Sequence, residues 1–497
     1  MGAARQRLAQ AGRLAAGAAL VVLLAGCGSS SSSKGNQTLR LALPLLPRTL
    51  DPAKAADLPS MNVAHELYAG LTRFTPDGVA PDLASSWSVS QRGRVWTFRL
   101  RRNLRWSDGR PITSEDFARS WLRALSLESQ APLAGPDLGI LRGARSYLEG
   151  RTGSGIDVEV PDPWTLRVTL QHPVPWFDEL AAYPIAAPVP PNGVAFSGPF
   201  RVALRHPGRI VLERNVNYWN ASAVKPSRLV LTTSTQGADA VLPRGLSPPG
   251  LPWIDTAGPT PKGSIEVPTL TTGLLWFVTR GTALADREAR LYAAWALTHL
   301  DLGSAPASLI APATPGAAYV NSHRPVQLGS RPVPLRLNVY WAREDLGGSR
   351  VAEALRRSAD QLRVSQIRLR FHPVATRSEL LALAGPPARP GVDIVLLGWS
   401  SKVLDAYNVL DLFPCGSAFN LARWCDPGYD ALMRKAVRTL DDQARWRIER
   451  QLVEKLHDAV PAIPVYNSSD SFSLRPGVHG FAWTPVGLYE LMGMTRS

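Results

Sequence analysis

Three cysteines are the residues of this 497-residue chain whose positions point most directly to covalent chemistry. Cys27 ends the tetrapeptide Leu-Ala-Gly-Cys, which is typical of a lipobox, where the cysteine is acylated and becomes the mature N-terminus. A basic start and the apolar run 14–24 precede it, as in a secretory signal peptide, and the run is shorter than the ~20 residues of a membrane-spanning helix. We therefore expect residues 1–26 to be a signal peptide and residues 27–37 a serine-rich tether that holds the chain, by its lipid, outside the cytoplasm. An uncleaved membrane anchor or an ordinary signal peptide is the alternative.

The other two cysteines, Cys415 and Cys425, form an even pair that suits an oxidising compartment. Their spacing closes a short loop, and we expect a disulfide between them. Two free thiols are the alternative. A two-thiolate metal site is a remote one, because no further cysteine or histidine flanks the pair.

Catalytic motifs are missing from the sequence. It has no Gly-x-Ser-x-Gly elbow, P-loop, His-Glu-x-x-His or Cys-x-x-Cys motif, and its eight histidines are dispersed, without carboxylates at metal-ligand spacing. We therefore predict that the protein is not an enzyme and has neither a metal site nor a cofactor. The formal charge of +15 could indicate a nucleic-acid partner, but the basic residues are scattered and form no helical stripe, so we predict none.

The length and the hydrophobic periodicity predict how these residues are held. The chain exceeds the ~250–300 residues at which single cores stop growing, so two or more lobes are expected. In the first half, Thr113 and Asp116 form a helix-capping arrangement, and alternation predicts strands at 38–43, 95–100, 165–170 and 210–213.

In the second half, strands and helices alternate. Strands are predicted at 335–340, 367–371, 393–397 and 463–466, and helices at 287–300, 349–362, 426–440 and 444–460. This order favours an α/β lobe with a largely parallel sheet. The segments 234–268 and 312–334 are loop-rich.

Several motifs, in order along almost the whole mature chain, resemble the extracytoplasmic solute-binding proteins of the oligopeptide and dipeptide importers (solute-binding family 5). They are Pro47–Pro52, Trp96–Asn103, Trp106–Thr113, Ser197–Phe200, Asn217–Trp219, Asp426–Asp430 and Pro461–Tyr466. Each motif alone is weak, but together they are specific.

The resemblance implies an α/β, two-lobed periplasmic-binding-protein-like fold of type II, with an extra domain inserted in lobe I. Carried over in order, lobe I takes residues 38–60, 160–262 and 475–497, the extra domain 61–159, and lobe II 263–474. It also implies a monomer that captures a peptide or peptide-like solute between hinged lobes and delivers it to the permease subunits of an ABC importer.

The resemblance also locates a candidate ligand site. In relatives that bind peptides, an aspartate after a Gly-Trp pair meets the free N-terminal ammonium of the ligand. Here the run from Gly398 to Tyr407 has Lys402 at that position, and a cation repels an ammonium. Trp399 is expected to form a wall of the cleft, because an indole face offers apolar area.

Three interpretations of Lys402 stay open. Asp405 replaces the missing counter-ion, or the ligand lacks a free amine or carries an anion, or Lys402 points to solvent. A second departure lies around Trp276, where the relatives' strand ends in Phe-Asn and this chain reads Trp-Phe-Val-Thr. We take Trp399, Lys402, Asp405, Tyr407 and Trp276 as the candidate ligand-binding residues.

Two other functions stay open besides solute capture for an importer. The departures at Lys402 and near Trp276 are compatible with a sensory or interaction lipoprotein that has kept the fold without transport. They are equally compatible with a receptor for a non-peptide solute.

Overall fold

The computed structural model describes residues 37–76, 78–151, 155–191, 194–242, 264–300, 307–321, 334–385 and 389–497. The expected signal peptide, Cys27 and nearly all of the tether lie outside these residues, as do most of the loop-rich segments 234–268 and 312–334. Among the described residues, no helix is long and apolar enough to cross a bilayer.

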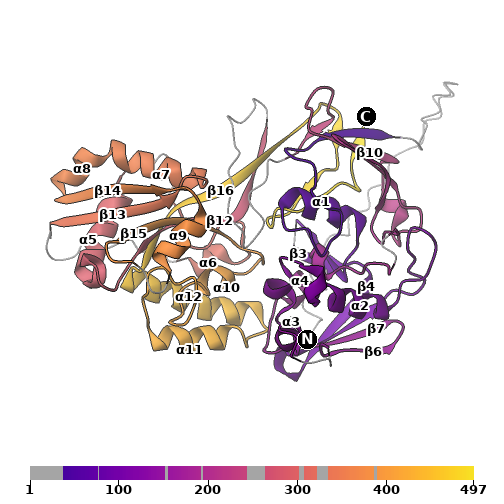
Figure 1. The fold of residues 1–497 in the computed structure, drawn as a ribbon, viewed down its shortest axis with the longest axis horizontal. Coiled ribbons are helices and arrows are strands. Elements are labelled where there is room, and N and C mark those ends of the chain that lie inside the picture. Colours follow the sequence, from indigo (N-terminus) through magenta and orange to yellow (C-terminus); the bar gives the residue numbers. More distant parts are fainter. Residues whose placement is uncertain are drawn as a thin grey trace, which may run out of the picture.

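Two bodies joined by long strands make up the molecule (Figure 1), and they agree with the expected two-lobed α/β fold. A ten-stranded sheet runs through both, in the order β14-β13-β15-β12-β16-β11-β1-β10-β9-β8. Strands β12 (Ile265–Phe277) and β16 (Ala462–Leu474) are its two thirteen-residue members and pass from one body to the other. We call the bodies lobe I, with its extra domain, and lobe II.

Lobe I and the extra domain share one hydrophobic core. The lobe I strands are β1 (Thr38–Ala42), β8 (Phe200–His206), β9 (Arg209–Arg214), β10 (Arg228–Thr232) and β11 (Ala240–Val241). The extra domain has a four-stranded sheet of β4 (Ala84–Ser90), β5 (Val95–Leu100), β7 (Thr165–Thr169) and β6 (Val158–Asp162), with α2 (Ser114–Leu125) packed on it. This sheet continues past residue 159, the expected end of the extra domain.

Short elements complete this body. They are α1 (Leu58–Leu67), β2 (Thr72–Thr75), β3 (Gly78–Pro81), η4 (Ala134–Leu138), α3 (Ala144–Leu148), α4 (Phe177–Leu180) and the strand pairs β17 (Val478–His479) with β20 (Thr495–Arg496) and β18 (Ala482–Trp483) with β19 (Tyr489–Glu490). Because α1 and the C-terminal strands enter the same core, the two ends of the described chain close lobe I together.

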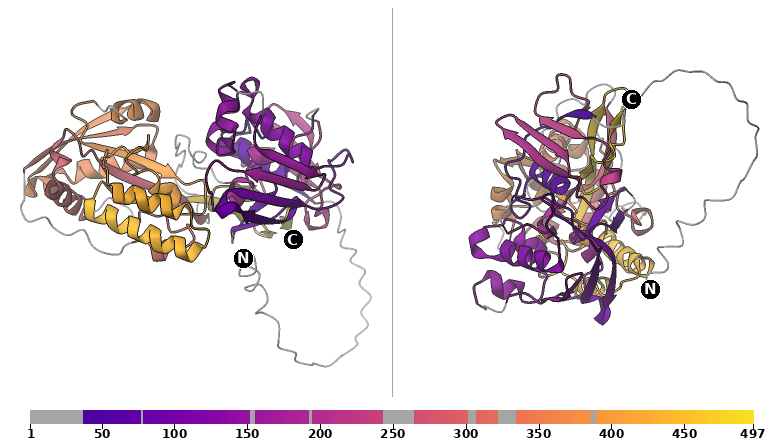
Figure 2. Two further views of the ribbon diagram at one scale, coloured as in Figure 1. Left: turned by 90° about the horizontal axis from the view of Figure 1, so that it is seen from below. Right: turned by 90° about the vertical axis from the view of Figure 1, so that its right-hand side faces the viewer.

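Lobe II is a sheet covered on both faces, with a separate hydrophobic core on each. Its other strands are β13 (Leu335–Ala342), β14 (Ile367–Val374) and β15 (Ile394–Ser400). One face carries α5 (Arg287–Thr298), α7 (Leu346–Arg357) and α8 (Ala359–Val364); the other carries α6 (Ala317–Val320), α9 (Arg377–Ala384), α10 (Tyr407–Leu410), α11 (Pro427–Ala436) and α12 (Asp442–Ala459). Figure 2 shows this layering from two further directions.

Most of the predicted elements are confirmed within a few residues. The capping box of α2 is present, because the Thr113 backbone N–H donates to Oδ2 of Asp116 at 2.8 Å. The sheet of lobe II is less parallel than expected: β13 pairs in parallel with β14 and β15, but β12 is antiparallel to β15 and β16. Those antiparallel pairings follow from the chain entering and leaving lobe II through neighbouring strands.

A buried carboxyl group connects α1 to the C-terminal segment. Glu66 is 2% exposed and its Oε1 accepts a hydrogen bond from the backbone N–H of Leu491 at 2.7 Å. Burial raises the pKa of Glu66 to about 8, although the bond from Leu491 and the charge of Arg73 favour the ionised form. The carboxyl group is therefore mostly protonated in the folded protein at neutral pH.

The substitution Glu66→Gln should stabilise the protein at alkaline pH. The folded-state pKa lies above the ordinary value of 4.5, so the contribution of the protonated group is complete below about pH 4.5 and is lost as the pH rises through about 8. Glutamine stays neutral and retains an acceptor for Leu491. Between pH 5 and pH 9 the free energy of unfolding of the variant should therefore rise relative to that of the wild type by roughly a few kcal/mol. Urea unfolding midpoints at pH 5, 7 and 9 measure this. The exposed Glu128→Gln is the matched control, and a pH-independent difference for Glu66→Gln would contradict the assignment.

Candidate functional site

Two of the five candidate residues meet in one cavity of lobe II. Trp276 on β12 and Trp399 on β15 lie on adjacent antiparallel strands, and both line a small cavity with room for about one water molecule. The rest of the lining is apolar: Leu381, Leu397, Gly398, Leu412, Phe419 and Leu421. Such a wall offers a ligand hydrophobic and aromatic contact rather than charge.

The two indoles differ in exposure and in partners. Trp276 is 2% exposed and stacks on Phe413 with ring centroids 4.8 Å apart. Trp399 is half-buried, and its indole N–H donates to Oδ1 of Asn408 at 3.1 Å. The guanidinium carbon of Arg377 lies 5.7 Å from the Trp399 ring centroid, which fixes one face of that indole.

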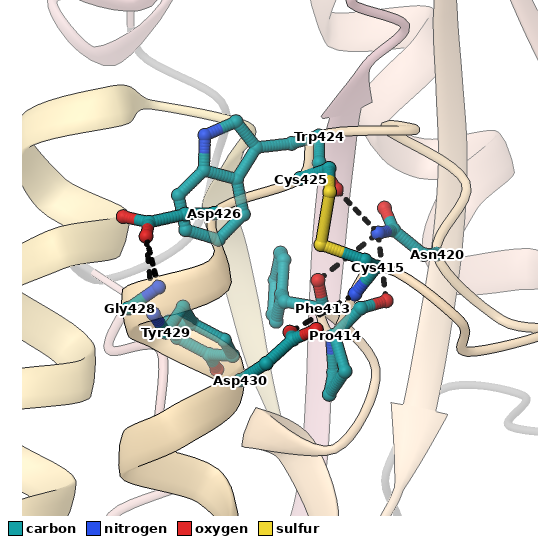
Figure 3. Close-up of a disulfide and its surroundings, with 10 residues drawn as sticks. All are labelled: Phe413, Pro414, Cys415, Asn420, Trp424, Cys425, Asp426, Gly428, Tyr429 and Asp430. Carbon is teal, nitrogen blue, oxygen red and sulfur yellow. Dashed lines mark hydrogen bonds between the residues drawn. A yellow bond between two sulfur atoms is a disulfide. The ribbon is translucent and has the colours of Figure 1, made fainter.

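A disulfide closes the loop that contributes Phe419 to this cavity. Figure 3 shows the disulfide and its surroundings. Cys415 and Cys425 are bonded, as the sequence predicts. The side-chain amide of Asn420 lies inside the closed loop and donates to the carbonyl oxygens of Phe413 at 3.0 Å and Trp424 at 2.7 Å. The loop therefore has a defined shape, and it carries Phe419 to a ring-centroid distance of 5.0 Å from Trp399.

Replacing both cysteines by serine should destabilise lobe II by about 2–3 kcal/mol, the scale expected for closing a short loop. The variant should also leave the Phe419 wall less ordered, with faster amide exchange across 415–425 than in the wild type. Thermal unfolding and hydrogen exchange measure the two effects. Alkylation of both cysteines in the exported protein without reductant would contradict the disulfide.

Lys402 is engaged by lobe I. Its Nζ lies 2.6 Å from Oδ1 of Asp137 on η4, and both side chains are largely buried. The Lys402 carbonyl oxygen accepts a hydrogen bond from the hydroxyl of Tyr183 at 2.6 Å. The cation is thus neutralised by a residue that the sequence analysis did not identify.

Asp405 is also engaged, and by its own lobe. Its carboxylate lies 2.8 Å from the guanidinium of Arg445 on α12, and the side chain is 2% exposed. Glu449, one turn further along α12, is fully buried beside them, and burial together with the negative charge of Asp405 holds its pKa well above the usual range. Asp405 therefore balances a buried arginine, which Asp442 also contacts at 2.8 Å, and turning Asp405 toward a ligand would break a buried ion pair.

Tyr407 lies where the lobes touch. Its ring stacks on Trp176 of lobe I with centroids 4.5 Å apart, and its hydroxyl donates to Oδ1 of Asp411 at 3.1 Å. Lys402 and Tyr407 thus contact lobe I, Asp405 pairs within lobe II, and none of the three lines the Trp276–Trp399 cavity.

A second small cavity, with room for about one or two water molecules, lies between the joining strands and lobe I. Its polar and aromatic lining consists of Thr269, Thr271, Ser400, Ser401, Asp470 and Trp483. The hydroxyl oxygens of Thr271 and Ser400 are 2.5 Å apart. The sequence analysis missed this lining, although Ser400 and Ser401 directly follow Trp399; nothing in the sequence points to Trp483.

No group of three His, Cys, Asp or Glu side chains in the described part of the chain could hold a metal ion. The candidate site consists of an apolar cavity within lobe II and a second cavity between the joining strands and lobe I.

Comparison with known proteins points to one family. Residues 78–296 match the profile of the bacterial extracellular solute-binding proteins, family 5 Middle. The probable deoxycholate-binding periplasmic protein YgiS of Escherichia coli (strain K12) is 25% identical over 88% of this chain and 89% of its own length. The dipeptide-binding protein of Lactococcus lactis subsp. cremoris (strain MG1363) is 24% identical over 95% of this chain and 96% of its own.

A solved structure shows the same fold. The periplasmic murein tripeptide-binding protein MppA, in an unliganded open form, has a TM-score of 0.76 at 20% identity, covering 93% of this chain and 97% of MppA. The matched region and these relatives make the chain similar to the bacterial extracellular solute-binding proteins of family 5. The family acts outside the cytoplasm.

Proposed function

We propose that this protein captures a peptide or peptide-like solute between its lobes and delivers it to the permease of an ABC importer. The observation that carries the proposal is the apolar cavity of Trp276 and Trp399, next to the strands that join the lobes. The second cavity supports it, because it lies where the joining strands meet lobe I. The names of the relatives, a dipeptide-binding and a murein tripeptide-binding protein, favour a peptide.

Recognition by neutral contacts is the second part of the proposal. Lys402 is paired with Asp137 and Asp405 with Arg445, so each charge at the family's ammonium-binding position is already balanced within the protein. Balanced charges neither attract nor repel a ligand terminus strongly. We therefore propose that Trp399 and Trp276 contact the solute, whereas Lys402, Asp405 and Tyr407 affect it through the positions of the lobes.

A matched pair of peptides tests this. Native mass spectrometry of the exported protein identifies what co-purifies, and calorimetry with Ala-Leu-Ala and N-acetyl-Ala-Leu-Ala should give Kd values within about threefold of each other, because no unbalanced charge faces the terminus. Trp399→Ala should weaken both by tenfold or more, and the exposed Trp164→Ala should weaken neither. Free peptide binding more than tenfold tighter would contradict neutral recognition. Binding of deoxycholate and of neither peptide would establish a non-peptide solute, as the name of the Escherichia coli relative suggests.

We also propose that acylation of Cys27 anchors the protein to the outer face of the membrane. The Leu24–Cys27 lipobox and the serine-rich tether support this. Cys27→Ser should release the protein into the medium or leave it unprocessed, which fractionation after a high-salt wash measures. A processed serine variant that still sediments with membranes would overturn the assignment.

A further inference from the structure

One loop of lobe II is packed into lobe I. We call residues 401–406 the crossover loop; it follows β15 and precedes α10. Val403 is 2% and Leu404 9% exposed, and both belong to the core of lobe I and the extra domain, not to the two cores of lobe II. The lobes are thus joined by two continuous strands and, among other described contacts, by the packing of this loop.

Polar contacts fasten the crossover loop to three places in lobe I and its extra domain. Lys402 Nζ pairs with Asp137 on η4 at 2.6 Å, and the Tyr183 hydroxyl donates to the Lys402 carbonyl oxygen at 2.6 Å. The backbone N–H of Leu404 donates to Oε2 of Glu179 on α4, also at 2.6 Å. The crossover loop places the cation of Lys402 against a surface of lobe I that carries carboxyl groups, so the charges of the two surfaces are complementary.

The other end of the loop is rooted in lobe II. Asp405 is held by Arg445 on α12, and the Tyr407 ring, at the start of α10, stacks on Trp176. The crossover loop is therefore in direct contact with lobe I at one end and with the helices of lobe II at the other.

The loop also lies beside the joining strands. The backbone N–H of Ser401 donates to the Leu270 carbonyl oxygen at 3.0 Å, and Ser400 pairs with Thr271. A contact this close to the axis of a hinge moves little when the distant ends of the lobes move far. It can therefore persist through closure and restrict the directions in which the lobes rotate.

We propose that the crossover loop is a third link at the hinge, in which Asp137, Glu179 and Tyr183 are positioning residues that fix the orientation of lobe II through Lys402 and Leu404. Trp399 and Ser400 immediately precede the loop, so the link also fixes where they face. The effect of this link on ligand capture rests on the proposed function. The existence of the link does not depend on that function. A link that restricts the orientations of the lobes in the ligand-free protein reduces the conformational entropy lost when a ligand binds. The affinity for the ligand is therefore higher.

The distance distribution between the lobes tests the link without any ligand. Spin labels on cysteines at Val216 of lobe I and Val364 of lobe II, both highly exposed, report it by pulsed electron resonance. In a Cys27→Ser background the two introduced cysteines are the free thiols, because Cys415 and Cys425 are bonded. The wild-type linkage should give one narrow distribution.

Lys402→Met and Asp137→Asn should each broaden that distribution at least twofold, and the exchanged pair Lys402→Asp with Asp137→Lys should narrow it again. Lys455→Met is the matched control, since Lys455 pairs with Asp426 at 2.8 Å entirely within lobe II, and it should leave the width unchanged. Circular dichroism confirms that each variant is folded.

Unchanged widths in folded Lys402→Met and Asp137→Asn would overturn the proposal, as would equal broadening in the Lys455→Met control. Failure of the exchanged pair to restore the narrow distribution would overturn the role of the ion pair. Because the measurement needs no solute, these results are independent of whether Ala-Leu-Ala binds.

Discussion

The pairing of β12 with β16 is the constraint on which the rest of the molecule depends. These strands bond to each other on both sides of the boundary between the lobes, from Ile265 opposite Phe472 to Trp276 opposite Ala462, with a register shift between Pro268 and Thr272. The break coincides with a proline, which cannot donate to a ladder. Beyond it Gly273 lies against the Tyr466 ring, where a Cβ would come within 2.3 Å of ring atoms, so only glycine lets the two strands approach there. The site residues take their places from this pair: Trp276 belongs to β12, and Trp399 lies on the strand that β12 pairs with.

A second feature of the molecule is that several of its buried ionisable groups are either neutral or paired with an opposite charge or a fixed donor. Glu66, Glu179 and Glu449 are all removed from water, and burial raises the pKa of each. Where a charge must persist, an opposite charge or a fixed donor accompanies it, as Arg445 accompanies Asp405. Buried pairs of this kind contribute little net stability compared with apolar packing, but removing one partner is costly, so they specify one arrangement of the parts.

The sequence was sufficient for the fold class and for most elements, because alternation and capping are local signals. The Thr113–Asp116 cap and the strand at 95–100 are examples. Trp276 and Trp399, which the sequence predicts as ligand-binding residues, line one cavity, and their contact with a ligand stays a prediction. The sequence could not supply the partners of the charges. Asp137 precedes Lys402 by 265 residues, and no periodicity links a short helical turn in the extra domain to a loop in lobe II. Nor could it place Trp483, whose position depends on how the C-terminal segment returns to α1.

Lys402 stands where peptide-binding relatives have an aspartate, and this difference depends on other residues of the protein. A carboxylate at 402 would add a second negative charge to the poorly solvated seam between the lobes and leave the buried Asp137 without its cation. The aspartate of peptide-binding relatives thus cannot be reintroduced alone without loosening the seam. Lys402 and Asp137 are chemically interdependent, and the contact they form gives position 402 a role in joining the lobes, where the relatives use it for the ligand. The charged group at position 402, which would meet a peptide ammonium in such a relative, here pairs with another residue of the protein itself.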